Sequence, residues 1–191
     1  ASNNAHKIKE IRAILGDFFD IVSLREAGVE SDPEETGKTF EENARIKAVA
    51  GMKASGMPCI ADDSGLEVLA LDCRPGVMSA RYSGSHGDDA ANNEKLLAEL
   101  ADKPDRSARY VCVICMAFPD GRELEARGEC YGEILKEKRG NGGFGYDPLF
   151  YFPQFDKTFA EISAEEKNEV SHRNAALKAF EKLWEKEIND K

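Results

Sequence analysis

The sequence predicts an α/β fold in which helices flank a mixed β-sheet, and two observations support this class. Segments with strand character occupy the middle of the chain, the strongest being residues 108–118 (ARYVCVICMAF). Apolar residues at helical spacing instead mark both ends. The 191 residues carry no repeat, linker or low-complexity tract, so we expect residues 1–191 to form one domain, or two lobes that share a core.

The first third of the chain predicts two helices with a strand between them. Ile8, Ile11 and Leu15 recur at helical spacing near the start of the chain. Thr39 and Glu42 match a capping box, in which the first residue caps a helix and the second reaches back to the cap. The expected elements are a helix over 5–15, a strand over 19–24, a loop over 28–38 and a helix over 39–55.

The middle of the chain predicts the strands of the sheet. The apolar segment 58–61 predicts a short buried strand that ends abruptly at Asp62. Residues 108–118 and 122–134 are separated by a Pro-Asp-Gly turn, and they predict an antiparallel pair. The other elements expected here are an extended segment over 66–71, an ordered loop over 74–87 and a helix over 88–100.

The last third predicts a glycine-rich loop over 140–148, a strand over 149–152 and a C-terminal helix. Ser163 and Glu166 form a second capping box before this helix. Its apolar stripe consists of Ala176, Leu177, Phe180, Leu183, Trp184 and Ile188.

Composition excludes several classes of function. Acidic residues outnumber basic ones by 36 to 26, and the resulting net charge of -10 argues against broad nucleic-acid binding and against docking on anionic membranes. No apolar run approaches the roughly 20 residues of a membrane span, and no signal-peptide pattern opens the chain. The 5 cysteines are an odd, scattered set, which indicates reduced thiols and a cytoplasmic location.

The start of the chain is polar and suits an anion. Ser2, Asn3 and Asn4 open a helix whose free N–H groups and positive dipole end could cradle a phosphate, and Lys7 adds a full charge. Most helix starts of this composition nevertheless bind nothing. The chain begins at Ala1 without Met and without a preceding strand, so we expect a few N-terminal residues to be missing.

The pair Asp62-Asp63 is the sharpest signal of chemistry. Two adjacent carboxylates directly after a buried strand repel one another unless a cation neutralises them. Oxygen ligands of this kind suit Mg²⁺. The segment Asp-Asp-Ser-Gly is also good turn chemistry, so a cation site and a simple polar turn are about equally well supported by these residues alone.

Two further segments point to a ligand. Phe144 lies in the glycine-rich loop, where it could stack on a base, although a surface loop with one anchoring aromatic explains it as well. Lys167, His172 and Arg173 bring three cation-capable groups within seven residues and could bind an anion or a base edge. An exposed helix face with salt bridges to neighbouring glutamates is the simpler explanation of this second segment.

Cys112 and Cys115 form a C-x-x-C pattern inside an apolar strand. No second pair and no histidine accompanies them, so we interpret both as core residues and expect neither a zinc site nor a redox site.

Taken together, these segments resemble the inosine triphosphate pyrophosphatase family, which hydrolyses non-standard purine nucleoside triphosphates. Six blocks in the family's order carry the resemblance across nearly the whole chain. They are 2–7 (SNNAHK), 34–48 (EETGKTFEENARIKA), 61–66 (ADDSGL), 75–82 (PGVMSARY), 142–148 (GGFGYDP) and 166–173 (EKNEVSHR). Two departures are Asn3, where the family commonly has glycine, and the absent strand before Ser2.

The resemblance implies an enzyme that converts dITP, ITP or XTP and water into the monophosphate and pyrophosphate. It also implies an elongated molecule in which two lobes sharing one sheet flank a central cleft, a homodimer, and a requirement for Mg²⁺. A pyrophosphatase for other modified nucleotides and a non-catalytic nucleotide sensor are the alternatives.

The resemblance further implies roles for individual residues. Asp63 and Lys47 are expected to be catalytic, with Asp63 orienting or deprotonating the water, and Glu35 and Asp63 to hold the metal. Asp62 and Glu34 are the substitutes within each acidic pair. The residues expected to bind the substrate are Ser2, Asn3, Asn4, Lys7, Ser64, Arg81, Phe144, Gly145, Tyr146, Asp147, Lys167, His172 and Arg173.

Overall fold

The computed structural model describes residues 5–190, and side chains from residue 8 onward. A six-stranded sheet has the strand order β2-β1-β3-β4-β5-β6. The helices are α1 (Ala5–Leu15), α2 (Phe40–Ser55), α3 (Asp89–Glu99), α4 (Ala164–Val170) and α5 (His172–Asn189). The strands are β1 (Cys59–Val68), β2 (Arg74–Pro75), β3 (Ser107–Ala117), β4 (Glu123–Ile134), β5 (Phe150–Phe152) and β6 (Lys157–Thr158). Short 3-10 helices are η1 (Leu69–Leu71), η2 (Gly76–Arg81) and η3 (Pro153–Phe155).

The chain divides into two compact units. Within the described residues, unit 1 comprises 5–63, 112–128 and 173–190, and unit 2 comprises 64–111 and 129–172. Each of the long strands β1, β3 and β4 contributes residues to both units. The α/β class is therefore confirmed. We expected a mixed sheet, whereas the ladders β1–β2, β4–β5 and β5–β6 are antiparallel.

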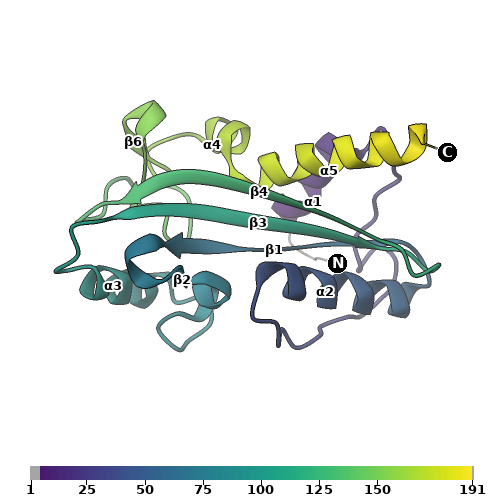
Figure 1. Ribbon diagram of the computed structural model, residues 1–191, viewed down its shortest axis with the longest axis horizontal. Coiled ribbons are helices and arrows are strands. Elements are labelled where there is room, and N and C mark those ends of the chain that lie inside the picture. The colour runs from purple at the N-terminus through teal and green to yellow at the C-terminus, as the bar shows by residue number, and fades with distance from the viewer. Residues whose placement is uncertain (1–4, 191) are drawn as a thin grey trace. The chain divides into compact units, whose positions relative to one another are not determined.

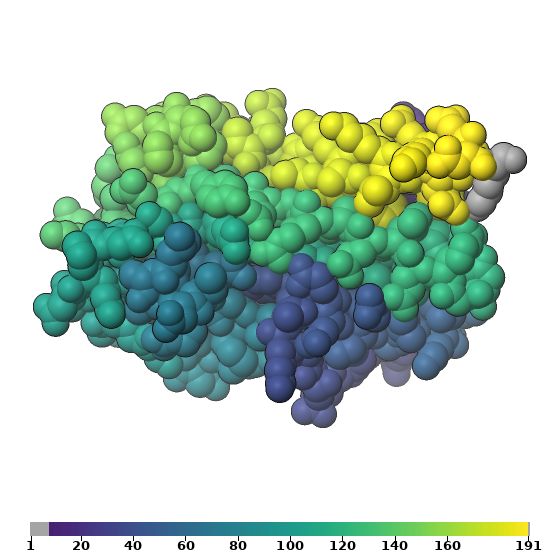
Figure 2. Space-filling model, viewed as in Figure 1, coloured from purple at the N-terminus to yellow at the C-terminus, as the bar shows by residue number. Residues whose placement is uncertain are grey.

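In unit 1, helices cover both faces of the strands (Figure 1). Alternate residues of β3, among them Ile114 and Met116, pack with Leu15 of α1 and with Leu177 and Phe180 of α5. The intervening β3 residues are buried as well, because α2 lies on the opposite face from α5. The predicted helices over 5–15 and 39–55 and the C-terminal apolar stripe are thereby confirmed. The outer side of α5 is open to solvent along its length (Figure 2).

In unit 2, the core is built around aromatic rings. Tyr110 of β3 packs on Phe150 at 4.6 Å and on Phe159 at 5.9 Å between ring centroids, and the two phenylalanines pack at 4.9 Å. Burying a phenylalanine side chain stabilises a fold by about 1.5–3 kcal/mol. Leu96 and Leu100, at the C-terminal part of α3, join the same core. This cluster fixes the backbone from which the loop over 140–148 projects.

The predicted strand over 19–24 is wrong, since this segment is irregular and then forms a turn. Its polar backbone groups are satisfied elsewhere: Arg12 Nε donates to the Ile21 carbonyl at 2.8 Å, and the Glu26 carboxylate accepts from the Ser23 N–H at 2.7 Å. Phe19 packs on Trp184 at 4.7 Å. The apolar residues of this segment therefore reflect packing and not pairing in a β-sheet.

Two local predictions about β1 and α2 also need correction. β1 does not end at Asp62; it continues as one strand through the acidic pair to Val68. Thr39 caps α2 by accepting from the Glu42 N–H at 3.1 Å, as expected. In a capping box the Glu42 carboxylate would accept from the N–H of Thr39. Here it accepts instead from the Lys38 N–H at 2.5 Å, one residue earlier in the chain. The second box, Ser163 with Glu166, is confirmed.

Cys112 and Cys115 are core residues, as the sequence predicted. Cys112 and Cys115 are buried in β3, and all 5 cysteines are free thiols. Among the described residues, no cluster of three or more histidine, cysteine or acidic side chains could hold a metal ion. No helix in this part of the chain is both long and apolar enough to cross a bilayer.

Candidate active site

Unit 1 contains a partly buried group in which one lysine joins two carboxylates. Lys47 Nζ, on α2, lies 2.9 Å from Glu35 Oε1 and 2.7 Å from Asp63 Oδ1. Glu35 belongs to the loop before α2, and Asp63 to β1. The two carboxylates therefore converge on a single cation, and their charges exceed that of the lysine by one.

Asn43 holds this group together. Its Nδ2 donates to Asp63 Oδ2 at 3.3 Å, and its Oδ1 accepts from the Gly37 N–H at 2.8 Å, so one fully buried amide links β1 to the loop that carries Glu35. A Cβ at Gly37 would stand 2.5 Å from Asn43 Oδ1 and 2.7 Å from Glu42 Cβ. Only glycine allows this close approach of the loop to α2.

The ionisation of the pair follows from its burial. Burial raises the pKa of Asp63, and this effect outweighs the lowering by Lys47. Burial opposes the charge of Lys47, but the attraction of Asp63 and Glu35 is stronger and raises the pKa of the lysine. Lys47 is thus a permanent cation. The ionised form of Asp63 would be stabilised by any additional positive charge.

Asp62, the other member of the acidic pair, has a different partner. Since successive side chains of a strand point to opposite faces, Asp62 and Asp63 face away from one another. Asp62 Oδ2 lies 3.6 Å from Arg173 Nε, and Arg173 Nη1 donates to Glu10 Oε2 at 3.0 Å. Burial opposes the charge of Arg173, yet Asp62 and Glu10 raise the pKa of its guanidinium. Glu34 is exposed.

Unit 2 contains a second polar group, centred on Asp147. This carboxylate is almost completely buried, and it accepts from Lys167 Nζ at 2.5 Å, from the Phe144 N–H at 2.9 Å and from the Tyr110 hydroxyl at 3.2 Å. Burial, with Asp147 nearby, raises the pKa of Tyr110, so the phenol remains a neutral donor. Asp147 is therefore occupied by groups of the protein and shapes the loop around Phe144.

Phe144 itself is presented to solvent. Its side chain is 68% exposed, and Lys167 Nζ lies 4.3 Å from the ring centroid. Gly143 and Gly145 have φ of 72° and 61°, in the left-handed region that favours glycine. A Cβ at Gly143 would stand 2.2 Å from Asp147 Oδ2. The loop thus holds an aromatic face in the open, with a cation beside it.

The remaining predicted residues of unit 2 are placed as follows. His172 stacks on Tyr110 with ring centroids 4.9 Å apart. Tyr146 is buried, and its hydroxyl donates to the Ser79 carbonyl at 2.9 Å. Ser64 is half-buried in β1, and the half-buried Arg81 is the last residue of η2.

Lys167 and Arg173, two of the three cation-capable groups noted in the sequence, have different acidic partners. Lys167 is paired with Asp147 in unit 2, and Arg173 with Asp62 and Glu10 in unit 1. The chain changes from α4 to α5 at Ser171, so Lys167 lies on α4 and Arg173 on α5. The expectations for Ser2, Asn3, Asn4 and the side chain of Lys7 lie outside the described part of the chain.

Sequence reasoning assigned no role to two residues that organise these groups, Asn43 and Tyr110. Both are buried polar side chains that bond an acid of the site. The only available signal for Asn43 was its position four residues before Lys47 on the same helix, which places both side chains on one face. Tyr110 had no such signal, because it lies in a strand of otherwise apolar core residues.

Comparisons with known proteins identify a family that this chain resembles over nearly its whole length. The model of the Ham1 family matches residues 1–183. A dITP/XTP pyrophosphatase of Desulfotalea psychrophila is 58% identical over 93% of this chain and 80% of its own length. A dITP/XTP pyrophosphatase of Clostridium perfringens is 52% identical over 93% of this chain and 91% of its own.

Solved structures show the same fold. The Ham1 protein of Staphylococcus aureus superposes with a TM-score of 0.89 at 47% identity, over 97% of this chain and 96% of that chain. A HAM1 protein from Coxiella burnetii gives a TM-score of 0.90 at 43% identity, over the same shares of the two chains. The fold is that of a small α/β protein of this structural class. This chain belongs to the Ham1 family.

Proposed function

We propose that this protein hydrolyses the non-standard purine nucleoside triphosphates dITP, ITP and XTP to the monophosphate and pyrophosphate. The relatives named dITP/XTP pyrophosphatase support this function over nearly the whole chain. The observation that carries it is the position of Lys47 between Glu35 and Asp63. In a protein of net charge -10, the excess carboxylate charge of this group can hold a divalent cation, and that cation together with Lys47 would attract a polyphosphate.

The donor set of this group fits Mg²⁺. Both carboxylates contact one Nζ, so their oxygens lie close enough to share a cation, and one lysine leaves a negative charge uncompensated. The described residues contain no third acid in the group. Magnesium is usually held in this way, by one or two carboxylates with substrate phosphates and water completing its shell. We therefore propose Glu35 and Asp63 as its ligands.

The metal, when bound, would supply charge neutralisation at the phosphate oxygens. Lys47 is a permanent cation on a fixed helix, and we propose that it binds the triphosphate and stabilises the negative charge that develops on it. Asp63, the more buried of the two acids, is proposed to orient the water and to accept its proton. Attack at the α-phosphorus then breaks the bond to pyrophosphate. Lys7, Arg81 and the polar segment before α1 are proposed to bind the outer phosphates.

The group around Asp147 is proposed to bind the purine base of the substrate. The open face of Phe144 can stack on a purine, which is worth about 1–3 kcal/mol in comparable systems. His172 and Arg173 are proposed as donors to the 6-keto oxygen, where adenine carries an amino group instead. A polar mismatch at a base-binding site discriminates strongly, because it leaves a polar group without its hydrogen bond.

Release of pyrophosphate from dITP, XTP, dGTP and dATP, each with Mg²⁺ and with a chelator, tests the function. We expect rapid release from dITP and XTP, slow release from dGTP and dATP, and loss of release with the chelator. Equal rates on all four would contradict the assignment of substrate. Preference for modified pyrimidines would favour the alternative pyrophosphatase, and tight binding without turnover would favour a nucleotide sensor.

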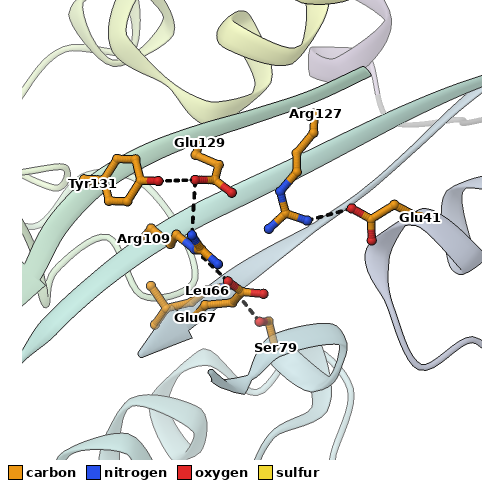
Figure 3. A network of polar contacts seen from close by, with 8 residues as sticks. All are labelled: Glu41, Leu66, Glu67, Ser79, Arg109, Arg127, Glu129 and Tyr131. Atoms are coloured by element: carbon orange, nitrogen blue, oxygen red, sulfur yellow. Dashed lines mark hydrogen bonds and ion pairs between the residues drawn. The ribbon is translucent and has the colours of Figure 1, made fainter. Parts of the chain in front are cut away.

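We also propose that the protein is a cytoplasmic homodimer. The free thiols support a reducing compartment. Unit 2 has a hollow of about 490 Å³ whose rim includes the half-exposed Leu69 and Tyr131. Beside it, Arg109 binds Glu67 and Glu129, and Tyr131 donates to Glu129 (Figure 3). Tyrosine and arginine are enriched in protein interfaces, and sedimentation equilibrium would reveal the association.

A further inference from the structure

Two adjacent asparagines at the start of α3 are buried although nothing above assigns them a role. Asn92 is 1% exposed and Asn93 is 2% exposed. Burying an amide costs free energy unless its polar atoms are hydrogen-bonded, so the partners of these side chains explain why they are there. The partners lie in the two loops of unit 2 that carry proposed substrate-binding residues.

Asn93 and its helix neighbour Asp89 hold the loop of Phe144. Asn93 Nδ2 donates to the Gly145 carbonyl at 2.8 Å and to the Asp89 carbonyl at 2.6 Å. Asp89 Oδ2 accepts from the Gly145 N–H at 2.6 Å. The helix therefore binds the peptide groups on both sides of Gly145, directly after the exposed aromatic ring. These bonds fix the left-handed backbone on which the direction of Phe144 depends.

Asn92 holds the other loop. Its Oδ1 accepts from the Ser83 N–H at 2.7 Å, and its Nδ2 lies 3.4 Å from the Ala80 carbonyl. These two contacts lie on either side of Arg81 in the chain. Lys95, one turn further along α3, donates to the Tyr82 carbonyl at 2.7 Å. The segment that presents Arg81 is thus hydrogen-bonded to α3 at Ala80, Tyr82 and Ser83, on both sides of the arginine.

The geometry of a helix explains why neighbouring residues can bind different loops. Consecutive side chains are about 100° apart around a helix of 3.6 residues per turn. Asn92 and Asn93 therefore point in different directions from one rigid turn. The two loops are also joined directly, because the Tyr146 hydroxyl donates a hydrogen bond to the Ser79 carbonyl at 2.9 Å.

A purely structural role explains the pair less well. Asn93 Oδ1 is buried without a hydrogen-bond partner among the described residues. An unsatisfied buried acceptor lowers stability, so Asn93 is a poor choice for packing alone. It is a good choice if the hydrogen bond that it donates to the Gly145 carbonyl is what the position requires.

We propose that Asn92 and Asn93 are positioning residues that set the triphosphate-binding loop and the base-binding loop, respectively, from one helical turn. The roles of Arg81 and Phe144 in this inference rest on the proposed function. Asn93 acts through Phe144 on base selection, and Asn92 acts through Arg81 on binding of the triphosphate, whatever the base.

The kinetic test compares Asn92→Ala and Asn93→Ala on dITP and dATP. Asn93→Ala is expected to lower the ratio of kcat/KM for dITP over dATP by about tenfold, the scale of one or two hydrogen bonds. Asn92→Ala is expected to raise KM for both substrates by a similar factor and to leave that ratio unchanged. Both readouts are independent of the folded fraction, since one is a ratio and the other a concentration. Unchanged values in both variants would overturn the proposal.

Two controls separate positioning from destabilisation. In a Phe144→Ala background, Asn93→Ala should not change the substrate ratio further, whereas an independent effect would contradict the coupling. Asn93→Asp keeps the volume but replaces the donors by an acceptor facing Gly145, so it should reproduce the alanine result. If Asn93→Asp retains the wild-type ratio, the proposed hydrogen bonds are not responsible.

A measurement without substrate distinguishes failure of this inference from failure of the proposed function. Chymotrypsin can cleave after the exposed Phe144, and cleavage after Tyr131, which is 60% exposed, serves as the internal reference. Cleavage after Phe144 relative to Tyr131 should rise about tenfold in Asn93→Ala and stay constant in Asn92→Ala. Equal increases at both sites would indicate general destabilisation and would refute the inference. An inactive wild-type protein with the expected cleavage pattern would refute only the proposed function.

Discussion

Replacing Asp63 by asparagine separates activity from stability. Asp63 Oδ1 lies 2.7 Å from Lys47 Nζ, an attraction of about 4 kcal/mol or more at the effective dielectric constant of a protein surface. Burial nevertheless raises the pKa of Asp63 in spite of this partner, which means that the carboxylate is less favourable in the folded protein than in the unfolded chain. The neutral Asp63→Asn side chain should therefore change the free energy of unfolding by no more than about 1 kcal/mol.

The same substitution should remove most of the turnover. Asparagine cannot accept the proton of the water and is a weaker metal ligand, so we expect kcat for dITP to fall by about 10²–10⁴-fold. The melting temperature should change by less than about 4 °C for a chain of this size. Pyrophosphate release and calorimetry measure the two effects on the same preparation.

The neighbouring acid provides the contrast. Asp62→Asn makes the same replacement at the preceding residue, but the partner of Asp62 is Arg173 and not Lys47. Its kcat with saturating dITP and Mg²⁺ should therefore exceed that of Asp63→Asn by at least about tenfold. Equal losses in both variants, or a near wild-type rate in Asp63→Asn, would refute the reasoning.

Three further predictions concern the metal, the base and alkaline pH. Glu35→Gln should raise the Mg²⁺ concentration for half-maximal activity about tenfold or more, whereas the exposed Glu34→Gln should not, and a magnesium titration compares them. Arg173→Ala should lower the ratio of kcat/KM for ITP over ATP, and an unchanged ratio would indicate that Arg173 contacts phosphate. Burial and the bond to Glu99 raise the pKa of Tyr82 from 10.0 to about 12, so its stabilisation is complete below pH 10 and lost as the pH rises toward 12. Urea unfolding should show this loss in the wild type and a weaker one in Tyr82→Phe.

Much of the fold could be predicted from periodicity and caps. The helices over 5–15 and 39–55 end where the apolar pattern ends, and Gly56 closes the second with φ of 70°. The strand over 108–118 differs from β3 by one residue at each end. The segment over 19–24 had equally good strand composition, but no ladder of the sheet pairs with it in the described part of the chain. Pairing is a property of the whole fold and is not visible in a local pattern.

The acidic pair shows what a turn signal cannot decide. Asp-Asp-Ser-Gly has the composition of a turn, yet it continues the strand. Both carboxylates form ion pairs in the folded protein, Asp63 with Lys47 and Asp62 with Arg173. The strand's alternation then sends Asp63 to Lys47 and Asp62 to Arg173. Which acid belongs to which group therefore became clear only once the register of β1 was known.

Buried amides were the least predictable part of the candidate site. Asn43, Asn92 and Asn93 are ordinary helix residues in sequence, and their partners are up to 52 positions away. The polar atoms that they satisfy belong to loops whose course no periodicity predicts. Positions of this kind are identified by asking where each buried polar group finds its hydrogen bonds.

Hydrolysis of dITP in ¹⁸O-labelled water with Mg²⁺ tests the central claim most directly. Attack of water at the α-phosphorus, oriented by Asp63 beside Lys47, places the label in the monophosphate and none in the pyrophosphate. Label in inorganic phosphate, with a diphosphate as the other product, would show attack at the outer phosphorus. That result would contradict the proposed chemistry of the acid–lysine group.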